Sequence, residues 1–516
     1  MTKANAAFTA PHADATEAGL SILKQGGSAI EAMVAAAAMI AVVYPHMNGI
    51  GGDGFWLIHR PNESPIAIDA AGFSASAVND FPQKTRGGAV AITQAGTLAG
   101  WKLALAEDPH RALSLSTILA PAIEQARHGF IVTQTLADAA KKLCQEEGPN
   151  QAFYDLFAPN GEPLKVGSVF TNPHLAETFE EIANQGIDHF YQGSLAQDII
   201  ATLSAAGSPL TLADHAKTKA KKVTPLKVAI EGAELYNLPA PTQGISSLMI
   251  LAIVDALKGQ VESEAEWTHL IVEATKQSFM MRDQILADPA FMQDNYPSLL
   301  TSAMPKMIAQ VNLSEAKPWP HVAETADTIW MGGTDQHGQM VSFIQSLYWE
   351  FGSGILIKNR GFVWNNRALG FSEDKQHPNA IGPNKKPKHT LNPALAIMDD
   401  GRRLIYGTMG GEGQPQTQAA LFSRYFFRNH SLTDAIAKGR WLLGRTWGDN
   451  DNDLKLEADL ADEIGSALTN KNHRWRTLPK HSELMGHAGA IATRKNIVID
   501  LATDPRSDGA AEKIPC

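Results

Sequence analysis

Apolar residues recur at helical spacing through most of the first 290 positions. This spacing predicts helices at 16–23, 28–43, 115–128, 133–147, 174–185, 197–206, 245–257 and 264–287. The segment 28–43 carries alanine on many faces, which indicates close packing against neighbouring elements. Strand patterns are predicted at 55–59 and 66–69, which we expect to pair, and at 226–236.

From position 328 the pattern changes to short strands separated by turns. The segments 328–333 and 340–346 are expected to form a hairpin around the turn 335–338. Further strands are predicted at 361–365, 394–399 and 403–407. Strands and helices come in blocks, without a steady alternation, and this order favours a layered α+β body over a doubly wound sheet.

The composition is that of a folded, acidic protein. Its 516 residues include 44 Lys and Arg against 54 Asp and Glu, for a formal net charge of −10, and 19% are charged. The low share of charged residues argues against a disordered chain, and the acidic balance argues against nucleic acid as a partner. The densest basic run has no aromatic residues and is interpreted as a solvated face; it consists of Lys217, Lys219, Lys221 and Lys222.

Cysteine and histidine usage indicates no structural metal or disulfide framework. The two cysteines are Cys144 and Cys516, with no CxxC pair, and the 17 histidines lack ligand spacing, so no metal and no cofactor are expected. His12, His46 and His389 are each interpreted as satisfied polar residues.

The N-terminus lacks the apolar region of a signal peptide, and the most apolar stretch, 30–43, is too short to span a bilayer. A soluble, cytoplasmic protein without a membrane partner is therefore expected.

Two glycine-rich runs invite a ligand-binding interpretation. The run 49–54 follows a helix and precedes a strand, the reverse of a dinucleotide fingerprint, so we interpret it as a tight turn. The run 407–415 follows a predicted strand, where successive backbone N–H groups can face an anion and form an oxyanion hole. A plain glycine turn explains the second run equally well.

The chain resembles the γ-glutamyltransferase family from end to end. The matching motifs in the first half are Pro-His-Ala-Asp-Ala-Thr-Glu-Ala-Gly at 11–19, Ala-Ile-Glu-Ala-Met at 29–33 and Pro-His-Met-Asn-Gly-Ile-Gly-Gly at 45–52. In the second half they are Phe-Gly-Ser-Gly at 351–354, Asn-Asn at 365–366, Phe-Ser at 371–372, Asn-Pro at 392–393 and Gly-Gly at 410–411. The resemblance implies a four-layer αββα N-terminal-nucleophile hydrolase, made as one chain that cuts itself before a threonine.

The family's threonine falls on Thr328, which implies cleavage between Asp327 and Thr328. The products would be a large subunit, 1–327, and a small subunit, 328–516, which together form one structural domain. The freed α-amine of Thr328, with a reference pKa of about 7.7–8.0, can act as base for its own hydroxyl. The resemblance assigns the oxyanion hole to Gly410 and Gly411, and support of the nucleophile to Ser346.

The chain departs from the family at the residues that recognise glutamate. No arginine occurs at 70–82, where the family has its carboxylate-binding arginine, and Gly370 replaces the aspartate that binds the amino group. The other replacements are Arg367 for a glutamine, Tyr348 for an asparagine, and His389 and Thr390 for paired serines. Removing a charged partner of a zwitterion costs several kcal/mol, so we expect a substrate without the glutamyl head.

A small acid amide fits this altered set, with Arg367 binding its carboxylate through both arms of the guanidinium. The competing interpretation is a surface arginine paired with Glu373 or Asp374. The stretches 327–331 and 348–354 look most like the oxamate amidohydrolase branch of the family.

Three functional hypotheses remain open from the sequence. The first is a self-processing amidohydrolase of a small acid amide such as oxamate, with hydrolysis favoured over transfer. The second is a genuine γ-glutamyl hydrolase or transferase, and the third is an inactive binding protein on the same scaffold. The resemblance leaves assembly of the two subunits into a dimer of heterodimers open.

Overall fold

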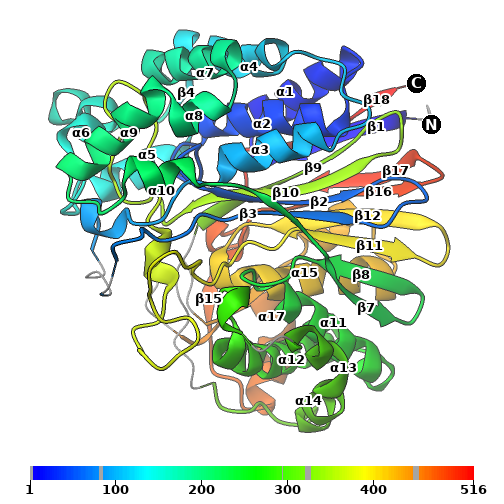
Figure 1. The fold of residues 1–516 in the computed structure, drawn as a ribbon. Helices are drawn as coiled ribbons and strands as arrows, with labels where there is room; N and C mark the ends of the chain where they lie inside the picture. The colour runs from blue at the N-terminus through cyan, green and yellow to red at the C-terminus, as the bar shows by residue number, and fades with distance from the viewer. Residues whose placement is uncertain are drawn as a thin grey trace.

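The computed structural model describes residues 4–78, 80, 85–292, 295–319, 327–444 and 452–515. Two antiparallel sheets are stacked face to face, and helices cover both outer faces (Figure 1). This arrangement is the predicted αββα sandwich.

The first sheet contains strands from both ends of the chain and from its middle, in the order β18-β1-β9-β10-β2-β3-β6. Its strands are β1 (Ala4–Ala10), β2 (Asp53–His59), β3 (Ile66–Ala70), β6 (Lys221–Val223), β9 (Asp327–Thr334), β10 (Met340–Tyr348) and β18 (Ala510–Pro515). The predicted hairpin is present as β9 and β10, and it lies between β1 and β2.

The second sheet has the order β17-β16-β12-β11-β8-β7. Its strands are β7 (Leu226–Ile230), β8 (Ala233–Asn237), β11 (Ala394–Met398), β12 (Arg402–Thr408), β16 (Ala488–Arg494) and β17 (Ile497–Thr503). Two small sheets flank the sandwich, made of β4 (Phe130–Ile131) with β5 (Val169–Phe170), and of β13 (Trp441–Leu443), β14 (Leu454–Glu457) and β15 (Trp475–Leu478).

Helices from the first 216 residues cover the first sheet, and later helices cover the second (Figure 1). The first layer is α1 (Ala13–Lys24), α2 (Ala29–Val43), α3 (Thr97–Ala106), α4 (Leu115–His128), α5 (Gln134–Leu143), α6 (Gln151–Phe157), α7 (Pro173–Gln185), α8 (Asp188–Gln192), α9 (Ser194–Ala205) and α10 (Leu212–Ala216). The second is α11 (Gly244–Leu257), α12 (Glu264–Ile285), α13 (Leu299–Ser302), α14 (Met304–Gln310), α15 (Gln414–Phe422), α16 (Leu432–Ala437) and α17 (Ala458–Asn470).

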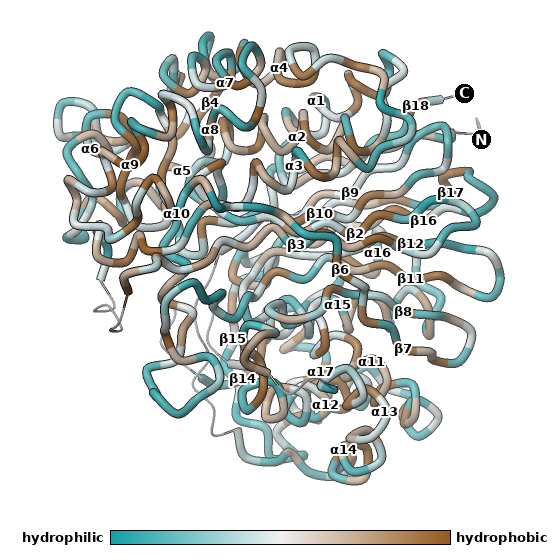
Figure 2. Tube along the Cα trace, viewed as in Figure 1, coloured by the Kyte–Doolittle hydropathy of each residue, from teal (hydrophilic) through white to brown (hydrophobic). Residues whose placement is uncertain are grey.

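Helix α2 shows how local sequence and packing agree. Ser28 and Glu31 cap its N-terminus reciprocally, since the Ser28 hydroxyl accepts from Glu31 N–H at 3.0 Å and the Glu31 carboxylate accepts from Ser28 N–H at 2.9 Å. Every residue of α2 is buried, as its alanine content predicts. Its buried position in the first helical layer accounts for its apolar character on all faces (Figure 2).

Side chains alternate across each strand and divide the core into separate layers. In β2, Trp56 and Ile58 join the cluster beneath the first helical layer, whereas Phe55 and Leu57 join the cluster between the two sheets. Trp330 of β9 also belongs to the cluster between the sheets. The same alternation decides which side chains at the strand ends face the gap between the sheets.

One expectation about secondary structure needs correction. The strand predicted at 361–365 is wrong, because this segment makes only isolated bridges, Gly51 with Trp364 and Leu356 with Val363.

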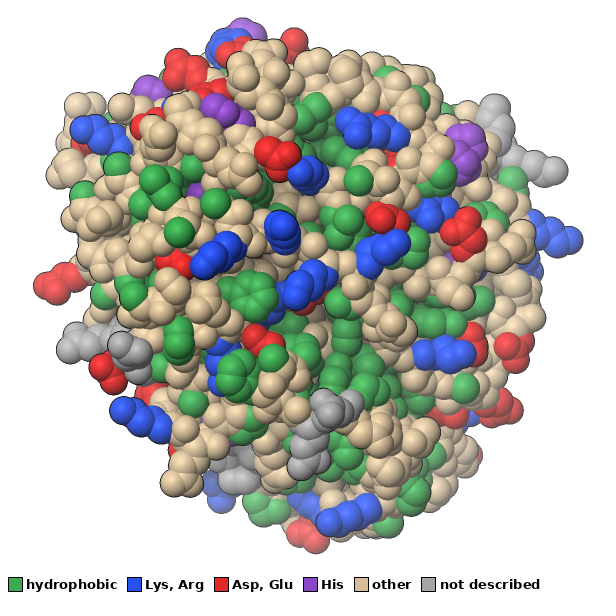
Figure 3. Space-filling model, in the orientation of Figure 1, with side chains coloured by type: hydrophobic (Ala, Val, Ile, Leu, Met, Phe, Trp, Pro, Cys, Tyr) green, Lys and Arg blue, Asp and Glu red, His purple; other side chains and the backbone are tan. Residues whose placement is uncertain are grey.

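The basic run 217–222 carries exposed lysines, as expected, and Lys222 Nζ lies 2.9 Å from the Glu107 carboxylate. On the face shown in Figure 3, basic side chains are interspersed with acidic and uncharged ones.

Candidate active site

Three polar residues lie side by side at the same end of neighbouring strands in the first sheet, and their side chains are on one face of it. Ser346 of β10 pairs directly with Asp53 of β2, and Thr328 lies beside Ser346, between the cross-strand pairs Ile329–Gln345 and Asp327–Tyr348. Thr328 is two residues from Trp330, and Asp53 is two residues from Phe55. Since Trp330 and Phe55 fill the space between the sheets, alternation directs Thr328 and Asp53 into the same gap.

The glycine-rich turn that follows β12 lies across this gap from Thr328. A Cβ added to Gly332 of β9 would lie 3.1 Å from Ile405 Cδ1, and one added to Gly407 would collide with the Trp330 ring. Position 332 of β9 therefore faces position 405 of β12, and position 330 faces position 407. Two residues further along each strand, Thr328 is placed opposite residues 409–410. Gly410 has φ 115° and Gly411 φ 51°, a left-handed conformation that glycine adopts without strain. We call residues 409–411 the oxyanion turn, after the role that the family resemblance predicts for Gly410 and Gly411.

Arg367 is fully buried and contacts the strand that carries Ser346. It begins the short helix η6 (Arg367–Gly370), where its Nη2 donates to Ser346 Oγ at 3.2 Å. Its guanidinium carbon lies 4.3 Å from the centroid of the Tyr348 ring, a cation–π contact. The Tyr348 backbone has φ 86°, and its N–H donates to Ser346 Oγ at 2.8 Å. The surface-arginine interpretation of Arg367 is therefore wrong.

Asp53 joins Arg367 to His389. Its Oδ2 lies 3.0 Å from His389 Nε2 and 4.0 Å from Arg367 Nε, while its Oδ1 accepts N–H donors from Gly72 at 2.8 Å and Gly96 at 3.2 Å. Burial, reinforced by the Arg367 charge, lowers the pKa of His389 to about 4. His389 is therefore neutral at pH 7 and donates its Nε2 proton to Asp53, which leaves Nδ1 as an acceptor.

Gln243 connects the His389–Thr390 segment to the oxyanion turn. Its side-chain amide donates to Thr390 O at 2.8 Å and to Gly411 O at 2.9 Å, and its backbone N–H donates to His389 O at 2.9 Å. Behind it, Arg282 donates to Gln243 Oε1 at 2.8 Å and pairs with Glu412. Contacts thus run continuously from Ser346 through Arg367, Asp53 and His389 to Gly411.

Three buried polar atoms at this site find no hydrogen-bond partner in the part of the chain that the structure describes. They are Asn366 Nδ2, His389 Nδ1 and Thr390 Oγ1. Buried polar atoms are almost always paired, and an unpaired one costs about 1–3 kcal/mol. Two donors and an acceptor from separate segments are suited to a small polar ligand.

The structure brings the predicted residues Thr328, Ser346, Tyr348, Arg367, His389, Thr390, Gly410 and Gly411 into one region. Sequence reasoning missed Asp53, although it is the one acidic residue of the glycine-rich run 49–54. It also missed Gln243, for which local sequence carries no signal. The turn interpretation holds for 49–52, where Gly52 N–H donates to Gly49 O at 3.1 Å within the segment 44–52 that links α2 to β2, whereas 53–54 already belong to β2.

The three histidines singled out from sequence differ in environment. His12 caps α1, where its Nδ1 accepts from Asp14 N–H at 3.2 Å, and His389 bonds to Asp53. His46 is buried with neither ring nitrogen bonded within the described residues, so the satisfied interpretation is wrong for His46.

One buried group outside the site has the composition of a metal site, namely His269, Glu273 and His473. His269 Nδ1 and His473 Nε2 are 2.7 Å apart, a direct hydrogen bond, and Lys276 Nζ lies 2.6 Å from Glu273. The Lys276 ammonium already neutralises the Glu273 carboxylate, and the two histidines bond to each other, so these residues do not fit a metal ion.

The fold and the strand-end threonine facing a glycine turn are typical of N-terminal-nucleophile hydrolases. A profile of the gamma-glutamyltranspeptidase family matches residues 15–514, and the chain belongs to this family. It is 45% identical to the oxamate amidohydrolase proenzyme of Klebsiella pneumoniae subsp. pneumoniae over 97% of both chains. It is 35% identical to the glutathione hydrolase-like YwrD proenzyme of Bacillus subtilis, again over 97% of both.

The solved structure of cephalosporin acylase from Bacillus halodurans superimposes with a TM-score of 0.90 at 27% identity, over 99% of this chain and 96% of that one. The αββα fold, the family and the enzyme class expected from sequence, a self-processing amidohydrolase, are confirmed. Within the described residues, none of the helices has the length and apolar character needed to cross a bilayer.

Proposed function

We propose that this protein hydrolyses the amide of a small carboxylic acid, such as oxamate, with Thr328 as nucleophile. The observation that carries the proposal is the buried group of Arg367, Asp53 and His389 beside Thr328. One fixed cation, a neutral imidazole and unpaired polar atoms suit a small anion bearing an amide.

The nucleophile is generated by cleavage of the Asp327–Thr328 bond. The Thr328 hydroxyl attacks the Asp327 carbonyl, the peptide becomes an ester on Oγ1, and water hydrolyses the ester. The products are the Asp327 carboxylate and a Thr328 α-amine. Thr328 is fully buried near the start of β9, where the pleat of the strand holds its side chain toward the oxyanion turn.

Turnover uses the same Thr328 hydroxyl that carried out self-cleavage. The α-amine of Thr328 takes the hydroxyl proton as Oγ1 attacks the amide carbonyl, and it returns that proton to the nitrogen that leaves, as ammonia in the case of oxamate. The developing oxyanion is stabilised by backbone N–H groups of Gly410 and Gly411. Water then hydrolyses the ester to the acid and restores Thr328. The Ser346 hydroxyl, opposite Asp53, supports the nucleophile from the adjacent strand.

Arg367 binds the substrate carboxylate in this proposal. Asp53 Oδ2 lies 4.0 Å from Arg367 Nε, close enough for the carboxylate to compensate the guanidinium charge. His389 Nδ1 accepts from the amide NH₂, and Thr390 lies next to it. Each of these groups recognises a feature that oxamate carries within a few bonds.

A substrate panel tests the proposal. Purified mature protein is assayed with oxamate, malonamate, succinamate, glutamine, glutathione and γ-glutamyl-p-nitroanilide, with release of ammonia or amine as the readout. We expect the shortest acid amides to be hydrolysed with the highest kcat/KM. Preference for γ-glutamyl compounds would instead support the glutathione hydrolase alternative, in which Asp53 would bind the α-amino group.

Hydrolysis is expected to exceed transfer to an added acceptor. Glycylglycine at neutral pH, added to the best substrate of the panel, should leave the acid as the main product. A predominance of the acylated dipeptide would contradict the hydrolytic assignment.

A further inference from the structure

The oxyanion turn is supported from behind by a second loop. This loop joins the short helix η9 (Glu483–Met485) to β16, and its His487 carbonyl accepts from Met409 N–H at 3.2 Å. A Cβ added to Gly486 would collide with the Met409 carbonyl oxygen and lie 2.8 Å from Thr408 Oγ1. The backbone at 486–487 is therefore packed directly against the turn, and its position limits where the turn can lie.

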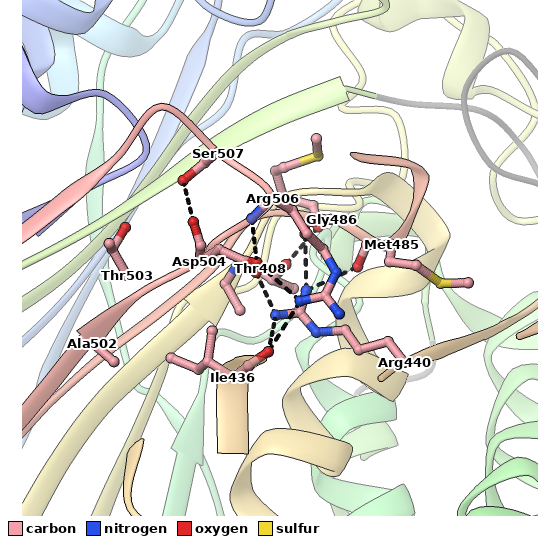
Figure 4. A network of polar contacts seen from close by, with 12 residues as sticks. Thr408, Ile436, Arg440, Met485, Gly486, Ala502, Thr503, Asp504, Arg506 and Ser507 are labelled. Carbon is pink, nitrogen blue, oxygen red and sulfur yellow. Dashed lines mark hydrogen bonds and ion pairs between the residues drawn. The ribbon is translucent and has the colours of Figure 1, made fainter. Parts of the chain in front are cut away.

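Arg440 fixes this supporting loop. One of its terminal nitrogens, Nη1, donates to Met485 O at 3.1 Å and to Gly486 O at 2.8 Å, and the other, Nη2, donates to Ile436 O at 3.0 Å and pairs with Asp504 (Figure 4). A planar guanidinium can reach these acceptors at once, which a single ammonium cannot do.

Arg440 is itself held in place by buried charges. Asp504 accepts from Ala488 N–H at 2.6 Å and from Arg506 Nη1 at 3.1 Å, so it links both arginines to the start of β16. Glu457 pairs with Arg506 and accepts from Arg440 N–H at 2.9 Å. All four side chains are at most 4% exposed, and their charges cancel. Such a buried group gives little net stability over an apolar one, whereas it fixes geometry strongly.

We propose that Arg440 is a positioning residue for catalysis. By holding the Met485 and Gly486 carbonyls it fixes the loop on which the oxyanion turn rests, and so aligns the Gly410 and Gly411 N–H groups with the reacting carbonyl. Arg440 acts through the loop and does not contact the substrate. The inference rests on the proposed role of Gly410 and Gly411.

The test compares Arg440→Lys with Arg403→Lys. Arg403 is a matched control near the start of β12, at the end of the strand away from the oxyanion turn. Like Arg440 it is buried, and it donates to a backbone carbonyl, Gly338 O at 2.9 Å, and to Asn496 Oδ1 at 2.8 Å. Both proteins are assayed on the amide that the wild type hydrolyses fastest. We expect Arg440→Lys to lower kcat at least ~10-fold with KM changed less than ~3-fold, because misaligned oxyanion donors affect the transition state selectively. Arg403→Lys should keep both constants within ~3-fold.

Two further measurements keep the outcomes distinct. If Arg440→Lys does not fold, Gly486→Ala displaces the Met409 carbonyl with Arg440 intact, and the same selective loss of kcat is expected. If the wild type hydrolyses none of the amides, the proposed function fails, and crystal structures of wild type and Arg440→Lys decide whether the Gly410 peptide moves. The inference is overturned if folded Arg440→Lys keeps the wild-type kcat. Where Gly486→Ala is the deciding variant, a wild-type kcat in that protein overturns it. Where the crystal structures decide, an unmoved Gly410 peptide overturns it.

Discussion

At the scale of single residues, the site is defined by charges placed where water is excluded. Arg367 has no exposed surface, yet it lies within 4.0 Å of Asp53 and over the Tyr348 ring, so its charge is compensated on two sides. A buried guanidinium with fixed neighbours is preorganised for an anion, because little side-chain freedom is lost on binding. Burial also keeps His389 neutral at pH 7, so Arg367 is the cation of the pair.

Arg367→Lys should be nearly as damaging as Arg367→Gln, because an ammonium cannot reproduce the planar fork. We expect kcat/KM for the best acid amide, measured from initial rates, to fall by an amount that corresponds to a loss of about 2–4 kcal/mol in transition-state binding. Self-cleavage requires no substrate and should survive, which gel electrophoresis checks on the same samples. Full activity of Arg367→Gln on acid amides would show that the carboxylate binds elsewhere.

At the scale of elements, local patterns predicted those parts of the fold that depend on local sequence. The hairpin of β9 and β10 is specified by its own turn and alternation, and α2 by its caps and alanines. The burial of Arg367 has no such local signal, because it depends on Asp53, which is more than 300 residues away. The Asp53–His389 contact joins positions 336 residues apart, and so only the assembled sheets reveal it. The segment 361–365 has a strand-like pattern, but its neighbours offer isolated bridges rather than a strand to pair with.

The contact between β9 and β12 depends on the absence of a side chain at Gly407. Gly407→Ala would place a methyl group against the Trp330 ring and force the two sheets apart near the site. We expect a loss of about 1–3 kcal/mol in unfolding free energy, measured with urea, together with slower self-cleavage. Gly259→Ala is the control, since nothing lies within 4 Å of its added Cβ. Equal stability of the two variants would contradict the tight contact.

At the scale of the whole molecule, buried neutral histidines couple folding to pH. Burial, with a smaller contribution from His487, lowers the pKa of His46 from 6.5 to about 3. As pH falls below 6.5 the unfolded chain takes up this proton while the folded chain does not, so stability is lost by about 1.4 kcal/mol per pH unit for such a histidine. His46→Phe should flatten the pH dependence by that slope between pH 6 and 4. Urea unfolding of the single-chain Thr328→Ala background measures it, and an unchanged slope would contradict the assignment.

Self-cleavage is also a property of the whole molecule, because the two products share both sheets. The residues of the small subunit in β9 pair with β1, and those in β10 pair with β2, while β11 pairs with β8. We therefore expect mature protein to give two masses, for 1–327 and 328–516, that elute together in gel filtration without denaturant. Thr328→Ala should remain one chain of 516 residues with the same elution volume. Thr328→Ser is the control that keeps a hydroxyl, and it should still cleave. Active wild-type protein that shows only the full-length mass would rule out Thr328 as an N-terminal nucleophile.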